Sequence, residues 1–182
     1  MKTILYSDRL QLRDLTSADW PNFLRLHLDE GVQQYIRSVD TEANLKKCFE
    51  QRIGPYQFES GQWLSLVIER LDNQQFVGLI GFRCDDVTLK RAEVGYLVAP
   101  EQQGSGYATE SLRAVIDWGA LQFEMHKYIA ICCHENQASR KVLENVGFVQ
   151  EGTLRQHTCI NQQWFDDCYF GLLTSQRVSL FS

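Results

Sequence analysis

The stretch PEQQGSGYATES, from Pro100 to Ser111, lies between a predicted strand and a predicted helix. Ala92 to Val98 before it is rich in strand formers, and Thr109 to Phe123 after it has apolar residues at helical spacing. Gly104 and Gly106 permit positive φ angles, so successive N–H groups near the helix start can point toward one anion. The stretch is therefore either an ordinary loop with a helix cap or a phosphate cradle. It matches neither a GxGxxG dinucleotide motif nor a P-loop.

Upstream of that junction the sequence predicts a strand, two helices and a hairpin. Arg9 to Arg13 reads RLQLR, and this alternation is typical of a half-buried strand. A capping pattern over Thr16 to Asp19 predicts one helix, in which Trp20, Phe23, Leu24 and Leu28 form an apolar stripe at helical spacing. Thr41 predicts the start of another helix. Two runs rich in strand formers, Trp63 to Leu71 and Gln75 to Phe82, are separated by a short polar segment, which predicts a tight hairpin.

Downstream of the junction the sequence predicts a strand, a short helix and a closing hairpin. Lys127 to Cys133 reads KYIAICC, a continuous apolar run typical of a buried strand. Asn136 to Asn145 is predicted to be helical, with Gly147 as its stop signal. The runs FVQEGTLRQHTC and WFDDCYFGLLT flank Ile160 to Gln163 and predict a long hairpin. We therefore expect an α/β (α+β) fold, one sheet with helices on its faces, in a single domain over residues 1–182.

Composition and charge exclude several classes of protein. Apolar residues make up 44% of the 182 residues, which is ordinary for a globular protein and excludes disordered and collagen-like chains. The formal net charge is −5 and the Lys and Arg residues are scattered, so we expect no nucleic-acid partner, whereas cationic or amine partners fit. The N-terminus lacks the apolar core of a signal peptide and no stretch is long enough to span a membrane. We therefore expect a cytoplasmic protein with no membrane partner.

The six cysteines include no CxxC pair and no spacing with histidine that would hold zinc. We therefore expect buried thiols and no metal site. None of the cysteines lies in a motif that pairs it with a histidine and an acid, so a covalent cysteine intermediate has no support from the sequence.

Two motifs in the second half carry a resemblance to a known family. Gln103 to Ala108 fits the Q/R-x-x-G-x-G/A signature of the GCN5-related N-acetyltransferase (GNAT) superfamily, and NQASRKVLENVGF follows at the expected separation. The chain resembles this superfamily over nearly its whole length. The phrases EVGYLVAP, GYATES and VQEGTLR resemble its RimJ/RimL-type branch, which acetylates protein N-termini, including ribosomal ones. The resemblance implies a single mixed, mostly antiparallel sheet with a splayed parallel pair of strands and helices on both faces.

The resemblance also implies acetyl-coenzyme A (acetyl-CoA) as the acetyl donor, bound where the parallel strands splay apart. Its pyrophosphate would lie in the loop from Gln103 to Ala108, and its pantetheine arm beside Leu97 and Val98. The Asn136 amide would bond the cofactor, although asparagine is also among the best helix N-caps. The cofactor-binding residues that the resemblance implies are Leu97, Val98, Gln103, Gly104, Ser105, Gly106, Tyr107, Ala108, Thr109, Asn136 and Ser139.

Acetyl transfer to an amine requires a neutral nitrogen, so something must take a proton from the ammonium form. Glu93, on the strand that borders the expected cleft, is the first candidate for this base. Its alternative is a surface strand residue paired with a lysine. His134 and Glu135, just past the strand that ends at Cys133, are either alternative bases or solvated loop residues.

The departing thiolate needs a proton, and the group that supplies it differs from the common pattern. Many relatives carry a tyrosine seven residues after the asparagine, but here that position is Leu143. Ser139 stands where the RimJ/RimL-type branch has serine, and it is either a proton donor or only a binding contact. A coenzyme A thiol has a pKa comparable to that of cysteine, about 8.5, so the thiolate needs only modest assistance to leave.

We therefore expect an N-acetyltransferase that moves the acetyl group from acetyl-CoA directly to a primary amine in a ternary complex. The branch favours a protein N-terminal α-amine. Two alternatives remain: a small amine such as a polyamine, an amino acid or an antibiotic, and a CoA-binding module without catalysis. The closing hairpin offers an edge that can pair two copies into a homodimer. The aromatic residues that can line an acceptor groove, or pack in the core, are Trp20, Phe23, Tyr35, Trp63 and Trp164.

Overall fold

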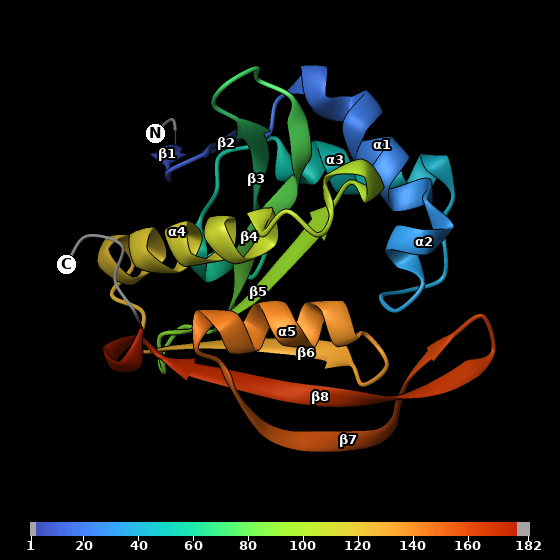
Figure 1. Ribbon diagram of the computed structural model, residues 1–182, viewed down its shortest axis with the longest axis vertical. Helices are drawn as coiled ribbons and strands as arrows, with labels where there is room; N and C mark the ends of the chain where they lie inside the picture. The colour runs from blue at the N-terminus through green and yellow to red at the C-terminus, as the bar shows by residue number, and fades with distance from the viewer. Residues whose placement is uncertain (1–2, 178–182) are drawn as a thin grey trace.

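The chain folds around one sheet of eight strands, and the computed structural model describes residues 3–177 (Figure 1). The strands are β1 (Ile4–Tyr6), β2 (Leu10–Asp14), β3 (Trp63–Arg70), β4 (Phe76–Asp86), β5 (Arg91–Val98), β6 (Lys127–Cys133), β7 (Val149–Ile160) and β8 (Gln163–Leu173). The α-helices are α1 (Trp20–Leu28), α2 (Glu30–Gln33), α3 (Glu42–Arg52), α4 (Tyr107–Gln122) and α5 (Gln137–Val146). The order of the strands across the sheet is β1-β2-β3-β4-β5-β6-β8-β7.

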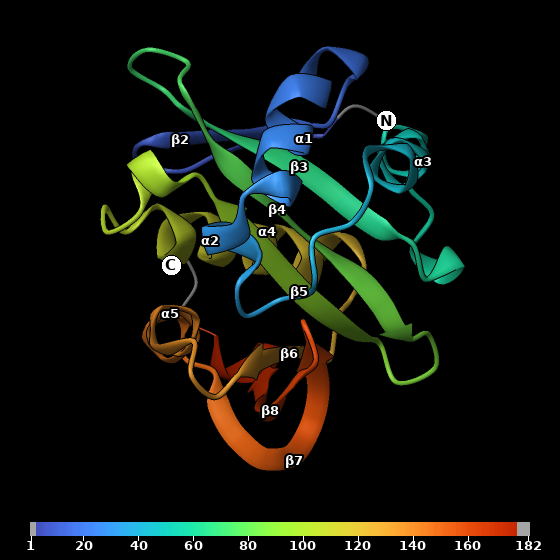
Figure 2. The ribbon, with the colours of Figure 1, turned by 90° about the vertical axis from the view of Figure 1, so that its right-hand side faces the viewer.

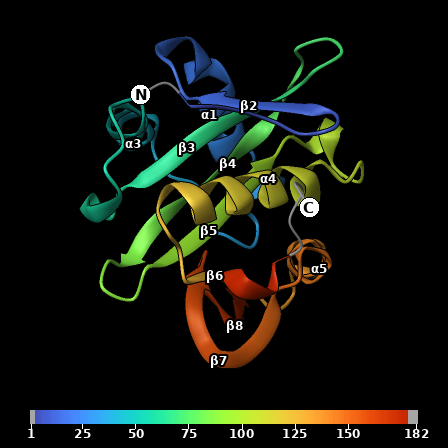
Figure 3. The same ribbon diagram turned by 90° about the vertical axis from the view of Figure 1, so that its left-hand side faces the viewer.

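Helices cover both faces of the sheet, which confirms the predicted arrangement. α1 and α3 pack on one face around a buried cluster that includes Phe23 and Phe49. α4 and α5 pack on the other face around a larger cluster that includes Phe82, Leu112 and Leu143. Figure 2 shows the side of α1, and Figure 3 shows the opposite side with α4 in front of the sheet. Both faces of the inner strands are therefore buried, as two packed layers of helices require.

Capping contacts confirm the predicted starts of three helices and the predicted end of one, whereas α4 begins at Tyr107, two residues before the predicted Thr109. Thr16 and Asp19 form a capping box ahead of α1, and the Thr41 side chain accepts a backbone N–H at the start of α3. The Asn136 side chain caps α5, and Gly147 ends that helix with a φ angle of 107°. These contacts join residues that are close in the chain, which is why the sequence pattern predicts them.

Three further details differ from the expectation. The strand β1 precedes the predicted opening strand and pairs with β2, but it is only three residues long, too short for a clear alternation. β4 continues to Asp86 instead of ending at Phe82. In α1 the predicted stripe included Leu28, which is 41% exposed, whereas Leu26 and His27 are buried. The reason is the helical period, since the stripe from Phe23 continues at positions three and four residues later.

The parallel strands β5 and β6 are paired only near their starts. The registered pairs are Arg91 with Lys127, Ala92 with Tyr128, and Glu93 with Ile129. Both strands continue beyond these pairs without further pairing to each other, to Val98 and Cys133. All other neighbouring strands are antiparallel. The mixed, mostly antiparallel sheet with a splayed parallel pair is confirmed, and the splay opens a gap in the sheet.

The closing hairpin is formed by β7 and β8, as predicted. β7 stands at the end of the strand order, so it has one edge without a neighbouring strand. Most of its side chains are exposed. Pairing of this edge with a second copy of the chain stays a prediction.

All six cysteines are free thiols. Cys84, Cys132, Cys133 and Cys168 are buried, Cys48 is half-buried and Cys159 is exposed. Within residues 3–177 no His, Cys, Asp and Glu side chains gather in a group of three or more that could hold a metal ion. No helix in the same range combines the length and the apolar character needed to cross a bilayer.

Candidate functional site

The gap between β5 and β6 opens into a cavity of about 910 Å³. One end lies at the loop before α4, which we call the cofactor end, and the other lies at α1, α2 and the segment after α2, which we call the acceptor end. The predicted site residues that line the cavity are Glu93, Leu97, Val98, Gln103, Gly104, Gly106, Tyr107, Ala108, Thr109, Asn136 and Ser139. Ser105, His134 and Glu135 are exposed and do not line it.

At the cofactor end, the loop before α4 presents backbone donors. Gly104 and Gly106 have φ angles of 76° and 80°, the left-handed conformation that glycine adopts without strain. A Cβ atom on Gly104 would meet nothing within 4 Å, so the backbone conformation, and not the space, favours glycine there. Gly106 is the N-cap of α4, and no side chain caps this helix start. The N–H groups of the first turn are therefore available to an anion, which fits the predicted pyrophosphate.

Across the gap, α5 places Ser139 against a tyrosine that the sequence analysis did not identify. The Oγ of Ser139 and the hydroxyl of Tyr96 lie 2.9 Å apart, and the same hydroxyl donates to the Ser139 carbonyl at 3.2 Å. Asn136 accepts the backbone N–H of Ser139 at 3.0 Å. Burial raises the pKa of Tyr96 well above its usual value, so its hydroxyl stays protonated at neutral pH. Leu143, at the position of the usual tyrosine, is buried in the core and lines the cavity with an apolar side chain.

Glu93 lies at the last paired position of β5 and β6, at the closed end of the gap. Its Oε2 accepts hydrogen bonds from Nη2 and Nε of Arg83 at 2.5 and 2.8 Å. Glu93 is thus paired, as its alternative interpretation expected, although the partner is an arginine on β4 instead of a lysine. Both bonds reach the same carboxylate oxygen, so the charge of Glu93 already has a cationic partner, which disfavours a role as the base.

His134 and Glu135 lie on the turn that follows β6, outside the cavity. Glu135 accepts a hydrogen bond from the Cys133 thiol at 2.8 Å. The Nδ1 of His134 lies 3.4 Å from the sulfur of Cys168. The structure therefore does not bring these two candidate bases to the gap.

The aromatic candidates for the acceptor groove separate into two groups. Tyr35 and Trp63 line the acceptor end of the cavity. Trp20 and Phe23 belong to the core beneath α1, and Trp164 is 59% exposed on the closing hairpin. Three of the five aromatic candidates are thus packed in the core or exposed.

Two arginines that the sequence analysis missed also line the acceptor end: Arg37, after α2, and Arg52, in the last turn of α3. Neither forms an ion pair with an acid in the described part of the chain. His27 lines the same end, and its burial, reinforced by the charges of these two arginines, lowers its pKa to about 4. His27 is therefore neutral at neutral pH, and its Nδ1 lies 2.7 Å from the Phe23 carbonyl. The two arginines make this end of the cavity basic.

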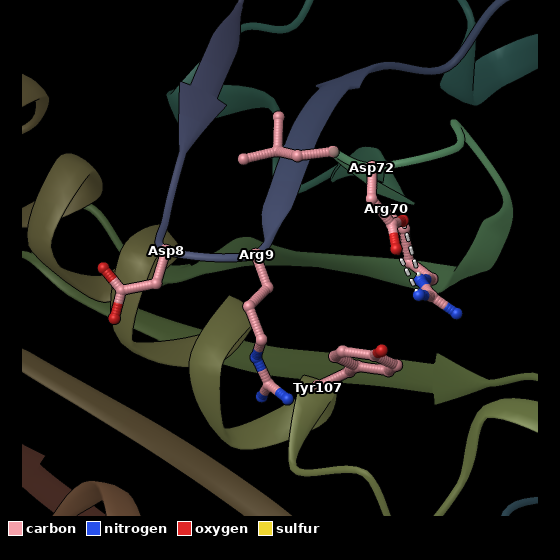
Figure 4. A pocket seen from close by; sticks show the side chains of 6 residues that line it. Asp8, Arg9, Arg70, Asp72 and Tyr107 are labelled. Atoms are coloured by element: carbon pink, nitrogen blue, oxygen red, sulfur yellow. Dashed lines mark hydrogen bonds and ion pairs between the residues drawn. The ribbon is translucent and has the colours of Figure 1, made fainter.

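A second, smaller cavity of about 190 Å³ lies beside Tyr107 (Figure 4). The guanidinium carbon of Arg9 lies 4.7 Å from the centre of the Tyr107 ring, and Arg9 pairs with Glu110 at 2.7 Å. Arg70 pairs with Asp72 at the far side of the same cavity. Since both arginines have partners, these contacts brace the first turn of α4 and leave the larger cavity as the candidate site.

Comparison with known proteins identifies the family. A model of the acetyltransferase (GNAT) domain matches residues 9–149. The chain is 29% identical over 178 residues to the uncharacterized N-acetyltransferase YoaA of Bacillus subtilis (strain 168), covering 95% of this chain and 98% of YoaA. It is 30% identical over 161 residues to the ribosomal-protein-serine acetyltransferase of Escherichia coli (strain K12), covering 88% of this chain and 79% of that protein. The crystal structure of spermidine N-acetyltransferase from Vibrio cholerae, in complex with CoA and spermine, has a TM-score of 0.81 at 23% identity, covering 93% of this chain and 98% of that one.

These similarities confirm the fold and the donor that the motifs indicated. The matched range includes β5, the glycine loop, β6 and α5, which frame the cavity. Because the relatives are N-acetyltransferases, the alternative of a CoA-binding module without catalysis is set aside. The chain belongs to the GNAT family and is an acetyl-CoA-dependent N-acetyltransferase.

Proposed function

We propose that the acceptor is the α-amine at the N-terminus of a polypeptide. The observation that carries this proposal is the charge of the acceptor end, where Arg37 and Arg52 lie. The carboxylates that line the cavity within the described residues are Glu93, already paired with Arg83, and Asp167. A polypeptide that enters with its N-terminus presents one ammonium group followed by carbonyl oxygens, and guanidinium groups bind such oxygens.

A polyamine fits this charge less well. It carries repeated ammonium groups, and two arginines in the same cavity repel them. The net charge of −5 favours cations over the whole surface. Because salt screens distant charges, the side chains nearest the acceptor determine its electrostatic energy inside the cavity. Both acceptor classes occur among similar proteins, since the E. coli relative is a ribosomal-protein-serine acetyltransferase and the V. cholerae neighbour is a spermidine N-acetyltransferase. The polyamine is therefore the second candidate.

We also propose direct transfer in a ternary complex, with no acetyl group on the enzyme. Cys132 and Cys133 line the cavity, but burial is the main cause that raises the pKa of Cys132 to about 12 and that of Cys133 to about 11. The thiolate is the nucleophilic form of cysteine, so neither thiol is prepared to accept the acetyl group. Isotope-labelled acetyl found on either cysteine after brief incubation would contradict direct transfer.

Mass spectrometry of acetyl transfer tests the acceptor. The panel contains peptides with free N-termini, the same peptides with a blocked N-terminus and a free lysine, spermidine, and an aminoglycoside. We expect acetylation of the free N-termini, faster where acidic residues follow the N-terminus than where basic residues do. Acetylation of spermidine alone would contradict the proposal and promote the second candidate.

A further inference from the structure

The closing hairpin contributes one buried carboxylate to the cavity. Asp167 of β8 is 4% exposed and lines the cavity. Its Oδ2 accepts a hydrogen bond from the hydroxyl of Thr158 on β7, which also lines the cavity. Within residues 3–177 no lysine, arginine or histidine forms an ion pair with it. Its hydrogen-bond partner is thus a neutral hydroxyl.

The register of the sheet places Asp167 on the same side of the gap as Glu93. Asp167 pairs with Cys133 of β6, and Glu93 pairs with Ile129 of the same strand. Cys133 and Ile129 are an even number of positions apart, so they and their partners point to one side of the sheet. Leu97, four positions after Glu93 on β5, packs against the cluster beneath α1, which identifies this as the side of the acceptor end. Along the strand, Asp167 lies about 13 Å farther toward the open end than Glu93, at about 3.3 Å per residue.

Arg140 is a cation whose charge reaches two of the thiols beside Asp167, Cys132 and Cys168, but it forms no ion pair with Asp167 in the described part of the chain. Three thiols lie close to Asp167, and burial is the first cause that raises the pKa of each, so they are neutral at neutral pH: Cys132, Cys133 and Cys168. The other titratable or charged groups near this strand end contact the thiols or line the cavity: His134 and Arg140 at Cys168, Glu135 at Cys133, and His157 in the cavity. Burial of a carboxylate that has no ion-pair partner costs free energy. An acceptor that enters as an ammonium ion removes this cost.

We infer that Asp167 binds the ammonium group of the acceptor and takes its proton, as the general base of the reaction. The inference rests on the proposed function only in that the acceptor is a primary amine. Thr158 holds one carboxylate oxygen, so the other oxygen is the one that receives the ammonium. Asp167 is therefore a catalytic residue, and Thr158 is the residue that positions it.

The proton and the electrons balance in this step. One N–H bond of the ammonium breaks as an O–H bond forms on Asp167, and the neutral amine attacks the carbonyl carbon of the acetyl thioester. A C–N bond forms and the C–S bond breaks. The surplus proton of the attacking nitrogen goes to the departing thiolate, and the proton on Asp167 returns to water.

The test compares Asp167→Asn with Asp166→Asn. Asp166 is the neighbouring acid on β8, is half-buried, accepts the backbone N–H of Gln156 at 2.7 Å and does not line the cavity. We expect Asp167→Asn to lower kcat/KM for the acceptor about 100-fold at neutral pH, the size of a lost general base. We expect the kcat/KM of Asp166→Asn for the acceptor to stay near the wild-type value. The affinity for CoA, measured by calorimetry, is unchanged in both variants, because Asp167 lies at the acceptor side.

The dependence on pH separates proton transfer from a structural role. An α-amine has a pKa of about 8, so at about pH 9 most of it is already neutral and needs no base for the first proton. We therefore expect the deficit of Asp167→Asn to shrink from about 100-fold to about tenfold between about pH 7 and about pH 9. A deficit that is the same at every pH overturns the inference. So does a greater loss in Glu93→Gln than in Asp167→Asn.

Two further arms keep the result interpretable. If circular dichroism shows that Asp167→Asn does not fold, Asp167→Ser, also neutral and smaller, repeats the same comparison. The assay uses whichever amine reacts in the acceptor panel. A reaction with spermidine alone contradicts the proposed N-terminal acceptor, and the comparison of Asp167→Asn with Asp166→Asn then decides the role of Asp167 on spermidine.

Discussion

The two ends of the cavity are built in different ways. At the cofactor end, one short segment from Gly104 to Thr109 supplies backbone N–H groups. Asn136, the N-cap of α5, and Ser139, in its first turn, add side chains. The acceptor end collects side chains from α1, α3, β3, β7, β8 and the segment after α2. A backbone cradle depends on a few φ angles, whereas an assembly of side chains depends on the packing of distant elements. This difference explains how proteins of one family can share a donor and differ in their acceptors.

Ser139→Ala gives the largest effect that we expect at the cofactor end. The substitution removes the hydroxyl that meets Tyr96, and we expect kcat to fall about 100-fold with little change in the affinity for acetyl-CoA. Tyr96→Phe keeps Ser139 but removes the hydroxyl that contacts both the Oγ and the carbonyl of Ser139, so kcat falls about tenfold. Steady-state kinetics and calorimetry measure the two quantities. Equal losses of kcat and affinity would show that Ser139 is only a binding contact. The cofactor end would then bind the donor without supplying a proton from Ser139.

The buried His27 at the acceptor end makes the stability of the folded chain depend on pH. Its pKa is lowered to about 4 in the folded chain, whereas a histidine in the unfolded chain titrates at about 6.5. The unfolded chain therefore binds more protons below about pH 6.5, and stability falls as the pH drops from there toward about 4. At about pH 5 the loss in the free energy of unfolding is about 2 kcal/mol.

Urea unfolding of the wild type and of His27→Gln checks this value. We expect the difference in the free energy of unfolding between about pH 7.5 and about pH 5 to be smaller in the variant by about 2 kcal/mol. An equal difference in both proteins would show that His27 does not cause the acid sensitivity.

Arg37→Glu changes the charge of the acceptor end alone. We expect kcat/KM to fall about tenfold for a peptide with acidic residues after its N-terminus and to rise for spermidine, since about 1.4 kcal/mol of interaction is a factor of ten. The KM for acetyl-CoA stays unchanged. Lys47→Glu, on an exposed part of α3 that does not line the cavity, is the matched control. If both acceptors respond alike to Arg37→Glu, charge at this end does not select the acceptor.

Gly104→Ala has the smallest expected effect and isolates the backbone of the cofactor end. A Cβ would meet nothing within 4 Å at either Gly104 or Gly152, but only Gly104 of the two has a positive φ. We expect Gly104→Ala to cost about 1 kcal/mol of stability and to raise the KM for acetyl-CoA a few-fold. Gly152→Ala leaves that KM unchanged. Thermal unfolding measures the stability, and initial rates measure the KM for acetyl-CoA. Equal changes of both quantities in the two variants would show that the positive φ of Gly104 is not the cause.

Two residues of the candidate site could have been found from the sequence by a closer use of alternation. Tyr96 follows Val94 by two positions, and both face the cluster beneath α4 and α5, so strand period alone directs Tyr96 toward α5. Asp167 lies in the closing hairpin, where the acid pair of Asp166 and Asp167 gives one carboxylate to each side of the strand. Arg37 has no such signal, because it lies in an irregular segment after α2.

By itself, the sequence determined the helix starts and stops, the strands long enough to alternate, the two glycines of the loop and the family. Each of these depends on residues close together in the chain. Only the tertiary structure decided that Arg83 forms an ion pair with Glu93. It also decided that His134 and Glu135 lie outside the gap, whereas Asp167 lines it. Those outcomes depend on strand register and on the packing of elements far apart in the chain. A shift of one residue in register would turn each strand side chain to the other face.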